Sequence, residues 1–280
     1  MRSYRSLRQI VGQVRKKQFA AAIDYQGLWK SAALPFIGGV SRRIGFSSQT
    51  IREFGVPILY TDRVRCTATH IAEQNGELSL RAGATNGVGA VVLAVPVIQE
   101  AFVLQLLRGF AIERYVVLSP AGGWRSKCWP PDRYGALCQK IHRELGLRCV
   151  INYGPGEDEL ISAVKASSGG AYPITYNGSL GQLMAFLCNA VCIVGGDTGP
   201  LHLAVTLGTP AVALFGPTDP ARNGPFRSGN SSAASPIDIV LRSTNAVTTY
   251  KRGDQPASSI LELTVDAVFD AVRRQVEARR

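Results

Sequence analysis

The sequence VCIVGGDTGPLHLA at residues 191–204 combines a strand, a tight turn and the start of a helix. Its first four residues form a short, partly β-branched apolar run before two glycines, which is typical of a buried strand. Asp197 and Thr198 are good helix N-caps, and Pro200 suits the first turn of the following helix. The free N–H groups and partial positive charge of that helix start favour a phosphate ligand. An ordinary, well-capped connection between a strand and a helix would give the same pattern.

A second stretch of this kind is TPAVALFGPTDP at residues 209–220. Its apolar run at residues 210–215 predicts another strand, and the Gly, Thr and Asp residues after it predict a turn. Two successive strands thus end in polar turns at one edge of a sheet, where open α/β sheets bind ligands. Together the two stretches resemble the C-terminal domain of the heptosyltransferases. These bacterial enzymes move heptose from ADP-heptose onto the inner core of lipopolysaccharide.

The loop SPAGGWRSKCWP at residues 119–130 follows a predicted strand at residues 115–119. Its glycines allow a ligand to approach the backbone closely, and Arg125 and Lys127 supply positive charge. The heptosyltransferases have a similar loop, in which a lysine before x-Trp-Pro contacts the donor diphosphate. The resemblance implies this role for Lys127, and a solvated loop lysine is the alternative.

The sequence GPGEDE at residues 154–159 follows a further predicted strand at residues 148–153. In the family, an acidic residue at this place contacts the ribose of the donor, which implies that role for Asp158. Glu157 or Glu159 would fit if the alignment shifted by one residue. A carboxylate suits a ribose because it can accept hydrogen bonds from two hydroxyl groups. Acidic residues that favour a helix N-terminus are the alternative.

In the same family context, the helix start at residues 197–202 is implied to bind the donor. Thr198 and Gly199 would meet the diphosphate, and His202 lies close enough to reach the diphosphate or the sugar. Asp197 is anionic and would repel phosphate, so we expect it to cap the helix or to bind a sugar hydroxyl. A histidine on a helix can also be a purely structural residue.

The sequence AIDYQGLWKSA at residues 22–32 is similar to a segment of the N-terminal domain of heptosyltransferases. We expect Lys30 and Arg52 to bind the acceptor. In the family, a strand and a Gly-Asp loop that carries the catalytic base come earlier in the chain. Only 23 residues precede Asp24, so we expect a shortened N-terminal domain without that loop. Asp24 is the candidate base, with a turn or capping role as its alternative.

The composition indicates a globular chain with an uneven charge. Of the 280 residues, 46% are hydrophobic and 18% charged, and the net charge is +11. Residues 1–65 hold twelve Lys and Arg against three Asp and Glu, a net +9. Nucleic acid, an anionic membrane face, an anionic substrate or a merely solvated surface could explain this charge. No interleaved basic and aromatic pattern is present, which argues against nucleic acid as a partner.

Other patterns exclude several classes of protein. The six cysteines have no metal-ligand spacing, so we expect a reduced cytosolic protein without a bound metal or cofactor. Glycines near residue 87 do not form a dinucleotide fingerprint. The apolar residues 88–107 are interrupted by Gly, Pro, Gln and Glu, which predicts a buried strand and then a helix instead of a membrane span.

Strands and helices alternate from residue 115 onward, with further strands predicted at residues 174–176 and 238–241 and a closing helix over residues 260–276. This order predicts a parallel, doubly wound α/β sheet. The resemblance implies two Rossmann-like domains of the GT-B arrangement, the N-terminal one incomplete. We expect an acceptor domain at residues 1–112 and a nucleotide-sugar domain at residues 113–280.

The resemblance implies inverting, metal-independent transfer of heptose from ADP-heptose to an anionic, lipid-linked acceptor of the Kdo-lipid A type. The enzyme would be cytoplasmic and peripherally associated with the inner membrane. Three alternatives stay open. The chain could use another nucleotide sugar, it could be a catalytically impaired nucleotide-sugar-binding relative, or it could be a basic module that binds membrane surfaces.

Overall fold

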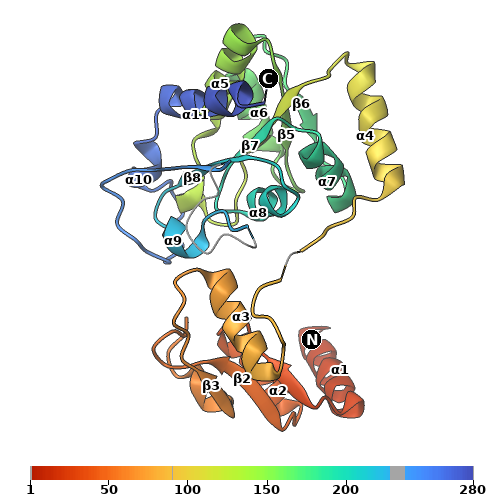
Figure 1. Cartoon of the computed structure of the whole chain (residues 1–280), viewed down its shortest axis with the longest axis vertical. Helices are drawn as coiled ribbons and strands as arrows, with labels where there is room; N and C mark the ends of the chain where they lie inside the picture. The colour runs from red at the N-terminus through yellow and green to blue at the C-terminus, as the bar shows by residue number, and fades with distance from the viewer. Residues whose placement is uncertain (1, 90, 228–236, 280) are drawn as a thin grey trace. The chain divides into compact units, whose positions relative to one another are not determined.

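The computed structural model describes residues 2–89, 91–227 and 237–279 (Figure 1). The chain divides into two compact units, Met1–Gly89 and Ala90–Arg280, which we call the N-terminal and C-terminal units. Each unit contains its own parallel sheet. Every described helix is too short or too polar to cross a lipid bilayer.

The N-terminal unit is built on a three-stranded parallel sheet in the order β1-β2-β3. Helix α3 packs on all three strands, and α1 packs on α2. Ile44, Phe46, Cys66 and Leu78 form its main buried cluster. A Cβ atom at Gly45 would lie 2.3 Å from the ring of Tyr60, so only glycine lets this ring lie against β2. The elements are α1 (Arg2–Lys17), β1 (Ala21–Ile23), α2 (Trp29–Ile37), β2 (Arg42–Phe46), η1 (Val56–Leu59), β3 (Asp62–Val64) and α3 (Ile71–Ala82).

The C-terminal unit is built on a six-stranded parallel sheet in the order β6-β5-β4-β7-β8-β9. The first strand of this unit, β4, lies in the middle of the sheet. Strands β5 and β6 are added on one side of it, and β7, β8 and β9 are then added on the other side. This reversal, between β4 and β7, is the switch point at which doubly wound sheets bind ligands. The strands are β4 (Tyr115–Ser119), β5 (Arg148–Asn152), β6 (Ile174–Tyr176), β7 (Cys192–Gly196), β8 (Ala211–Phe215) and β9 (Ile239–Arg242), which confirms the strands predicted from residue 115 onward.

Helices cover both faces of this sheet, because the side chains of each strand point alternately to the two faces. Val116 and Leu118 of β4 belong to one buried cluster, and Tyr115 and Val117 belong to the other. The first cluster includes residues of α5 (Pro131–Leu145), α6 (Asp158–Ala166), α10 (Ser258–Leu261) and α11 (Val265–Glu277). The second includes residues of α4 (Val97–Gly109), α7 (Leu180–Cys188) and α8 (Gly199–Thr206).

The structure differs from the sequence predictions at the start of the C-terminal unit. The chain divides after Gly89, earlier than residue 112, because α4 packs against α7 and buries Val103 and Leu107 in the C-terminal core. No strand forms at residues 91–96, and Val92 is 90% exposed. An apolar run was therefore a poor guide to burial here.

The closing helix predicted over residues 260–276 is two helices, α10 and α11. Thr264 separates them, and its hydroxyl accepts a hydrogen bond from the backbone N–H of Ala267 at 3.2 Å. This N-cap starts α11 afresh. Helix α11 packs on α5 and on strands β7 and β8.

Candidate functional site

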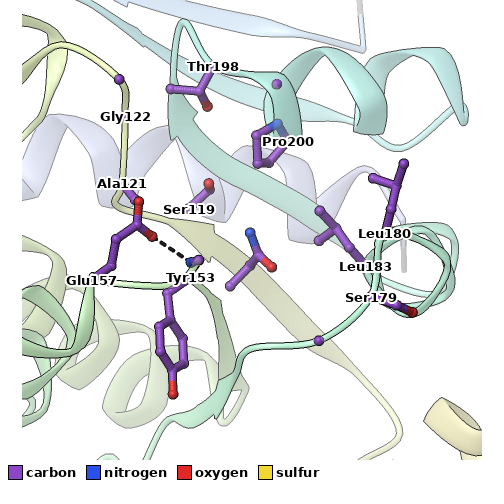
Figure 2. Close-up of a pocket in the computed structure, with 15 residues that line it drawn as sticks. Ser119, Ala121, Gly122, Tyr153, Glu157, Ser179, Leu180, Leu183, Thr198 and Pro200 are labelled. Carbon is purple, nitrogen blue, oxygen red and sulfur yellow. Dashed lines mark hydrogen bonds between the residues drawn. The ribbon is translucent and has the colours of Figure 1, made fainter. Parts of the chain in front are cut away.

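A pocket of about 400 Å³ opens at the carboxyl ends of β4, β5 and β7, at the switch point of the sheet (Figure 2). Three connections between strands and helices supply most of its walls, and the start of α7 supplies another. Figure 2 shows the side chains of these loops around the opening. Among the lining residues are Ser119, Gly122, Tyr153, Glu157, Ser179 and Thr198.

Two glycines let the loop after β4 lie directly on the loop after β7. A Cβ atom at Gly122 would lie 3.2 Å from Cγ2 of Thr198, and one at Gly196 would lie 3.1 Å from the carbonyl oxygen of Lys127. Both separations are tighter than ordinary van der Waals contact. We call residues 119–130, which carry Lys127, the lysine loop. Because glycine has no side chain at these two positions, the lysine loop can lie directly against the residues that begin α8.

Helix α8 begins at this pocket. Thr198 is its N-cap residue, but its side chain forms no capping hydrogen bond; its hydroxyl donates to the carbonyl of Gly196 at 3.3 Å. Gly199 and Pro200 line the pocket, so the first turn of α8 faces it. The N-terminal N–H groups and the helix dipole thus offer a site for an anion.

Asp197, Lys127 and His202 form a hydrogen-bonded cluster beside the helix start. Nζ of Lys127 lies 2.6 Å from Oδ2 of Asp197, and Nε2 of His202 lies 3.1 Å from Oδ1. The side chains of Lys127 and Asp197 are 16% and 10% exposed. The sequence predicted all three residues in one site. The predicted capping role of Asp197 is not seen, since its carboxylate binds the two side chains instead.

Burial alone would raise the pKa of Asp197, but hydrogen bonds from His202 and Lys127, together with their charges, lower it to about 2. Asp197 is therefore a carboxylate at any physiological pH. The cluster holds a charge pair across loops that are 70 residues apart in the chain.

This low pKa predicts a loss of stability in acid. Asp197 has a lower pKa in the folded chain than the ordinary value of 3.8, so its contribution is complete above about pH 4 and disappears as the pH falls towards 2. We expect it to be worth about 2 kcal/mol of unfolding free energy. Urea unfolding at pH 5, 4 and 3 should show a smaller difference between wild type and Asp197→Asn as the pH falls. A constant difference across this range would contradict the assignment.

The two acidic residues considered for ribose binding lie differently. Asp158 is exposed at the start of α6 and is not among the pocket residues. Glu157 lines the pocket, and its Oε2 accepts a hydrogen bond from the backbone N–H of Gly154 at 2.6 Å (Figure 2). The structure thus brings Glu157 to the pocket in place of Asp158, a shift of one residue.

Several pocket residues were not singled out as site residues from the sequence. Asn152 and Tyr153 end β5 or follow it directly, so their position at the carboxyl end of a strand was the available signal. Ser179, with Gln182, forms a capping box at the start of α7. Leu180 and Leu183 of α7 add an apolar wall.

In the N-terminal unit, Asp24 is 7% exposed, and its carboxylate accepts four hydrogen bonds. Oδ1 accepts from the backbone N–H groups of Gln26 at 2.9 Å and Gly27 at 3.2 Å. Oδ2 accepts from the hydroxyl of Ser31 at 2.9 Å and that of Tyr60 at 2.7 Å. Burial, followed by the hydrogen bond to Asp24, raises the pKa of Tyr60, which keeps its phenol a donor.

Lys30 and Arg52 are both exposed. Lys30 lies at the start of α2, which follows β1, and Arg52 lies in the loop that follows β2. The two loops touch: the backbone N–H of Trp29 donates to Oε2 of Glu53 at 2.8 Å. Both cations therefore lie at the carboxyl edge of the N-terminal sheet. Among the described residues, no group of three or more His, Cys, Asp and Glu side chains could hold a metal ion.

Comparisons with known proteins agree with this architecture. Residues 7–238 match the model of glycosyltransferase family 9 (heptosyltransferase). Lipopolysaccharide heptosyltransferase 3 of Escherichia coli K12 is 32% identical over 113 residues, which are 38% of this chain and 32% of the relative. Lipopolysaccharide heptosyltransferase 1 of the same strain is 28% identical over 81% of this chain and 70% of its own length. The chain thus spans about a third of the length of the first curated relatives it matches.

Solved structures give the same result. The E. coli heptosyltransferase WaaC with ADP matches with a TM-score of 0.69 and 25% identity, over 97% of this chain and 78% of that one. E. coli ADP-heptose lipopolysaccharide heptosyltransferase II matches in fold, with a TM-score of 0.71 at 18% identity, over 99% of this chain and 82% of that one. The predicted α/β fold class is therefore confirmed, and the chain belongs to glycosyltransferase family 9, the heptosyltransferase family.

Proposed function

We propose that this chain transfers heptose from ADP-heptose to an anionic, lipid-linked saccharide acceptor of the Kdo-lipid A type in lipopolysaccharide biosynthesis. The observation that carries the proposal is the pocket at the switch point, which the start of α8 lines, with Lys127 bound to Asp197 just before that helix. The similar protein WaaC was solved with ADP and with ADP-2-deoxy-2-fluoro heptose. A nucleoside diphosphate sugar fits a pocket of this volume and polarity.

The donor would lie across the carboxyl ends of the strands. Leu180 and Leu183 supply an apolar wall for the adenine base, and Glu157 can accept hydrogen bonds from the ribose hydroxyls. The diphosphate would then lie on the backbone of Gly122 and at the first turn of α8, beside Thr198. This orientation places the sugar on the side of Asp197 and His202.

The reaction is direct displacement at the anomeric carbon with inversion. A base takes the proton of the acceptor hydroxyl, the new C–O bond forms, and the bond to the diphosphate breaks to release ADP. Negative charge grows on the leaving diphosphate. We propose that Lys127 and the N–H groups of α8 stabilise this charge without a metal ion. The four hydrogen bonds that Asp24 accepts favour a structural role for its carboxylate over proton transfer.

The acceptor side of the proposal rests on charge. Lys30 and Arg52 are exposed at one sheet edge of the N-terminal unit, and residues 1–65 carry a net charge of +9. Phosphate and carboxylate groups on the acceptor, and an anionic membrane surface, are complementary to that charge. We therefore propose peripheral association with the cytoplasmic face of the inner membrane.

The donor assignment is tested by calorimetry on the full chain with ADP, UDP and ADP-heptose, and by a transfer assay with Kdo-lipid A. We expect binding of both adenine nucleotides and turnover. Preference for UDP would indicate a transferase with another nucleotide sugar, and binding without turnover would indicate a catalytically impaired relative. No nucleotide binding would contradict the proposal.

Glu157→Gln should weaken ADP binding about tenfold, because a carboxylate bonds ribose hydroxyls more strongly than an amide does. Its matched control is Asp158→Asn, which removes the same charge from the exposed neighbouring residue. We expect the control to change the affinity less than twofold. Equal effects of both variants would show that charge near α6 matters and that Glu157 makes no specific contact.

A further inference from the structure

The cluster at the helix start has little net positive charge to offer a diphosphate. Lys127 is hydrogen-bonded to the carboxylate of Asp197, so the two charges balance. Glu157 adds a further carboxylate to the pocket wall. A nucleoside diphosphate brings several negative charges into this surrounding, and the dipole of α8 amounts to about half a charge. A second cation near Lys127 would offset the negative charge of the diphosphate.

Arg252 is such a cation, and Trp124 connects it to Lys127. The guanidinium carbon of Arg252 lies 5.5 Å from the centre of the Trp124 ring, and Nζ of Lys127 lies 4.2 Å from the same centre. Both distances lie within the range of cation–π attraction. One aromatic ring thus contacts both cations, although they are far apart in the sequence.

The backbone also fixes the segment that carries Arg252. The N–H of Ser126 donates to the carbonyl of Gly253 at 3.3 Å, and the N–H of Ala257 donates to the carbonyl of Ser126 at 3.2 Å. A Cβ atom at Gly253 would lie 3.3 Å from Cβ of Ser126, so the two backbone segments are in close contact there. Arg252 is thereby attached to the lysine loop, while its side chain stays exposed.

The place of this group follows from the pocket lining. Gly122 and Gly123 line the pocket and Trp124 comes directly after them. Thr198 lines it from the other side, and Asp197 comes directly before that residue. Trp124 and Asp197 are thus direct chain neighbours of pocket-lining residues, and Lys127 contacts both of them, while Arg252 contacts Trp124. We infer that this group lies beside the glycines and the start of α8, where a phosphate group would bind.

We propose that Arg252 is a second cation for the donor diphosphate, and that Trp124 is the positioning residue that holds it beside Lys127. This inference rests on the proposed function, because it concerns the same nucleotide. Arg252 would contact phosphate oxygens through its guanidinium group, whose planar N–H donors match a diphosphate. As the diphosphate leaves, both cations would stabilise its growing charge.

The test compares Arg252→Gln with Lys251→Gln by calorimetry, using ADP and adenosine as ligands. The control removes the same charge from the neighbouring exposed residue, so any effect of overall charge is common to both variants. We expect Arg252→Gln to weaken ADP binding about tenfold, to leave adenosine binding unchanged, and to reduce the salt dependence of ADP binding. We expect Lys251→Gln to change ADP affinity less than twofold.

The role of Trp124 is tested with a conservative pair. Trp124→Leu should reproduce the loss of ADP affinity, with adenosine affinity intact, and Trp124→Phe should restore most of it, because phenylalanine also offers a ring face to cations. Equal effects of the Arg252 and Lys251 variants, or no effect of Arg252→Gln in a chain that binds ADP, would overturn the inference alone. A wild-type chain that does not bind ADP would overturn the proposed function as well.

Discussion

Replacing Lys127 with methionine should reduce kcat/KM for heptosyl transfer about a thousandfold. Under the proposed function, Lys127 stabilises the leaving diphosphate together with the start of α8 and Arg252, and it is the cation that binds Asp197 directly before that helix. Loss of one such preorganised donor costs a factor of 100 to 1,000 in other enzymes, and a full charge lies at the upper end of this range. Methionine keeps most of the aliphatic length, so packing in the loop changes little.

The measurement is the initial rate of transfer from ADP-heptose at saturating and limiting donor, with the unfolding free energy of each variant. Lys140→Met is the matched control: Lys140 is another ion-paired lysine of the C-terminal unit, which lies in α5 and binds Asp266. We expect its transfer rate to stay within twofold of wild type. A Lys127→Met variant with near-normal kcat and only a raised KM would show that the lysine binds the ground state and the transition state equally, and so does not accelerate the chemical step.

The strands of the C-terminal sheet were predictable from the sequence because their information is local. Parallel strands buried on both faces appear as short, continuous apolar runs, and each run here ends in a turn of Gly, Thr, Asp or Pro. Predicted and observed strands, such as residues 115–119 and 174–176, agree closely. Because all strands are parallel, their polar ends meet at one edge, which located the pocket before the strand order was known.

The division between the units was less predictable. An apolar helix such as α4 can pack on either side of a boundary, and nothing in its own sequence states which core it joins. The structure shows that Val103 and Leu107 pack with α7 in the C-terminal core. The exposed residues before α4 are of the same apolar types as those of a buried strand. Burial there depends on the partner surface and cannot be derived from hydropathy alone.

The site illustrates a different limit. Lys127, Asp197 and His202 were each expected near the donor, yet their mutual hydrogen bonds depend on how the loop after β4 folds over β7. Which of Glu157 and Asp158 faces the pocket depends on the residue at which α6 begins, since Glu157 precedes the helix and Asp158 is its first residue. Acidic residues are favourable at either position of a helix start, so the sequence leaves both open.

The contacts of Asp24 were also beyond the sequence, and they lead to the second large expected effect. Its partners Ser31 and Tyr60 lie 7 and 36 residues away in the chain. Asp24→Ala should destabilise the N-terminal unit by about 3 kcal/mol, because four donors, two of them buried, lose their acceptor and a charged acceptor contributes more than a neutral one. Urea unfolding followed by amide hydrogen exchange in the N-terminal unit measures this effect, since tryptophan fluorescence would also report Trp124 and Trp129 of the C-terminal unit. Glu53→Ala is the control, since this more exposed carboxylate accepts a hydrogen bond from the backbone N–H of Trp29 in the adjacent loop.

Asp24→Asn separates a structural role from a catalytic one. The amide oxygen can still accept from the N–H groups of Gln26 and Gly27, so the turn after β1 should persist while the bond from Tyr60 is lost. If Asp24 is structural, the variant should lose stability and keep its transfer rate within about tenfold at a temperature where it is folded. A general base contributes a factor of 100 to 10,000, so a far larger fall in kcat with unchanged stability would identify Asp24 as the base. The four hydrogen bonds to its carboxylate lead us to expect the first outcome, because a base must present a free lone pair to the acceptor hydroxyl.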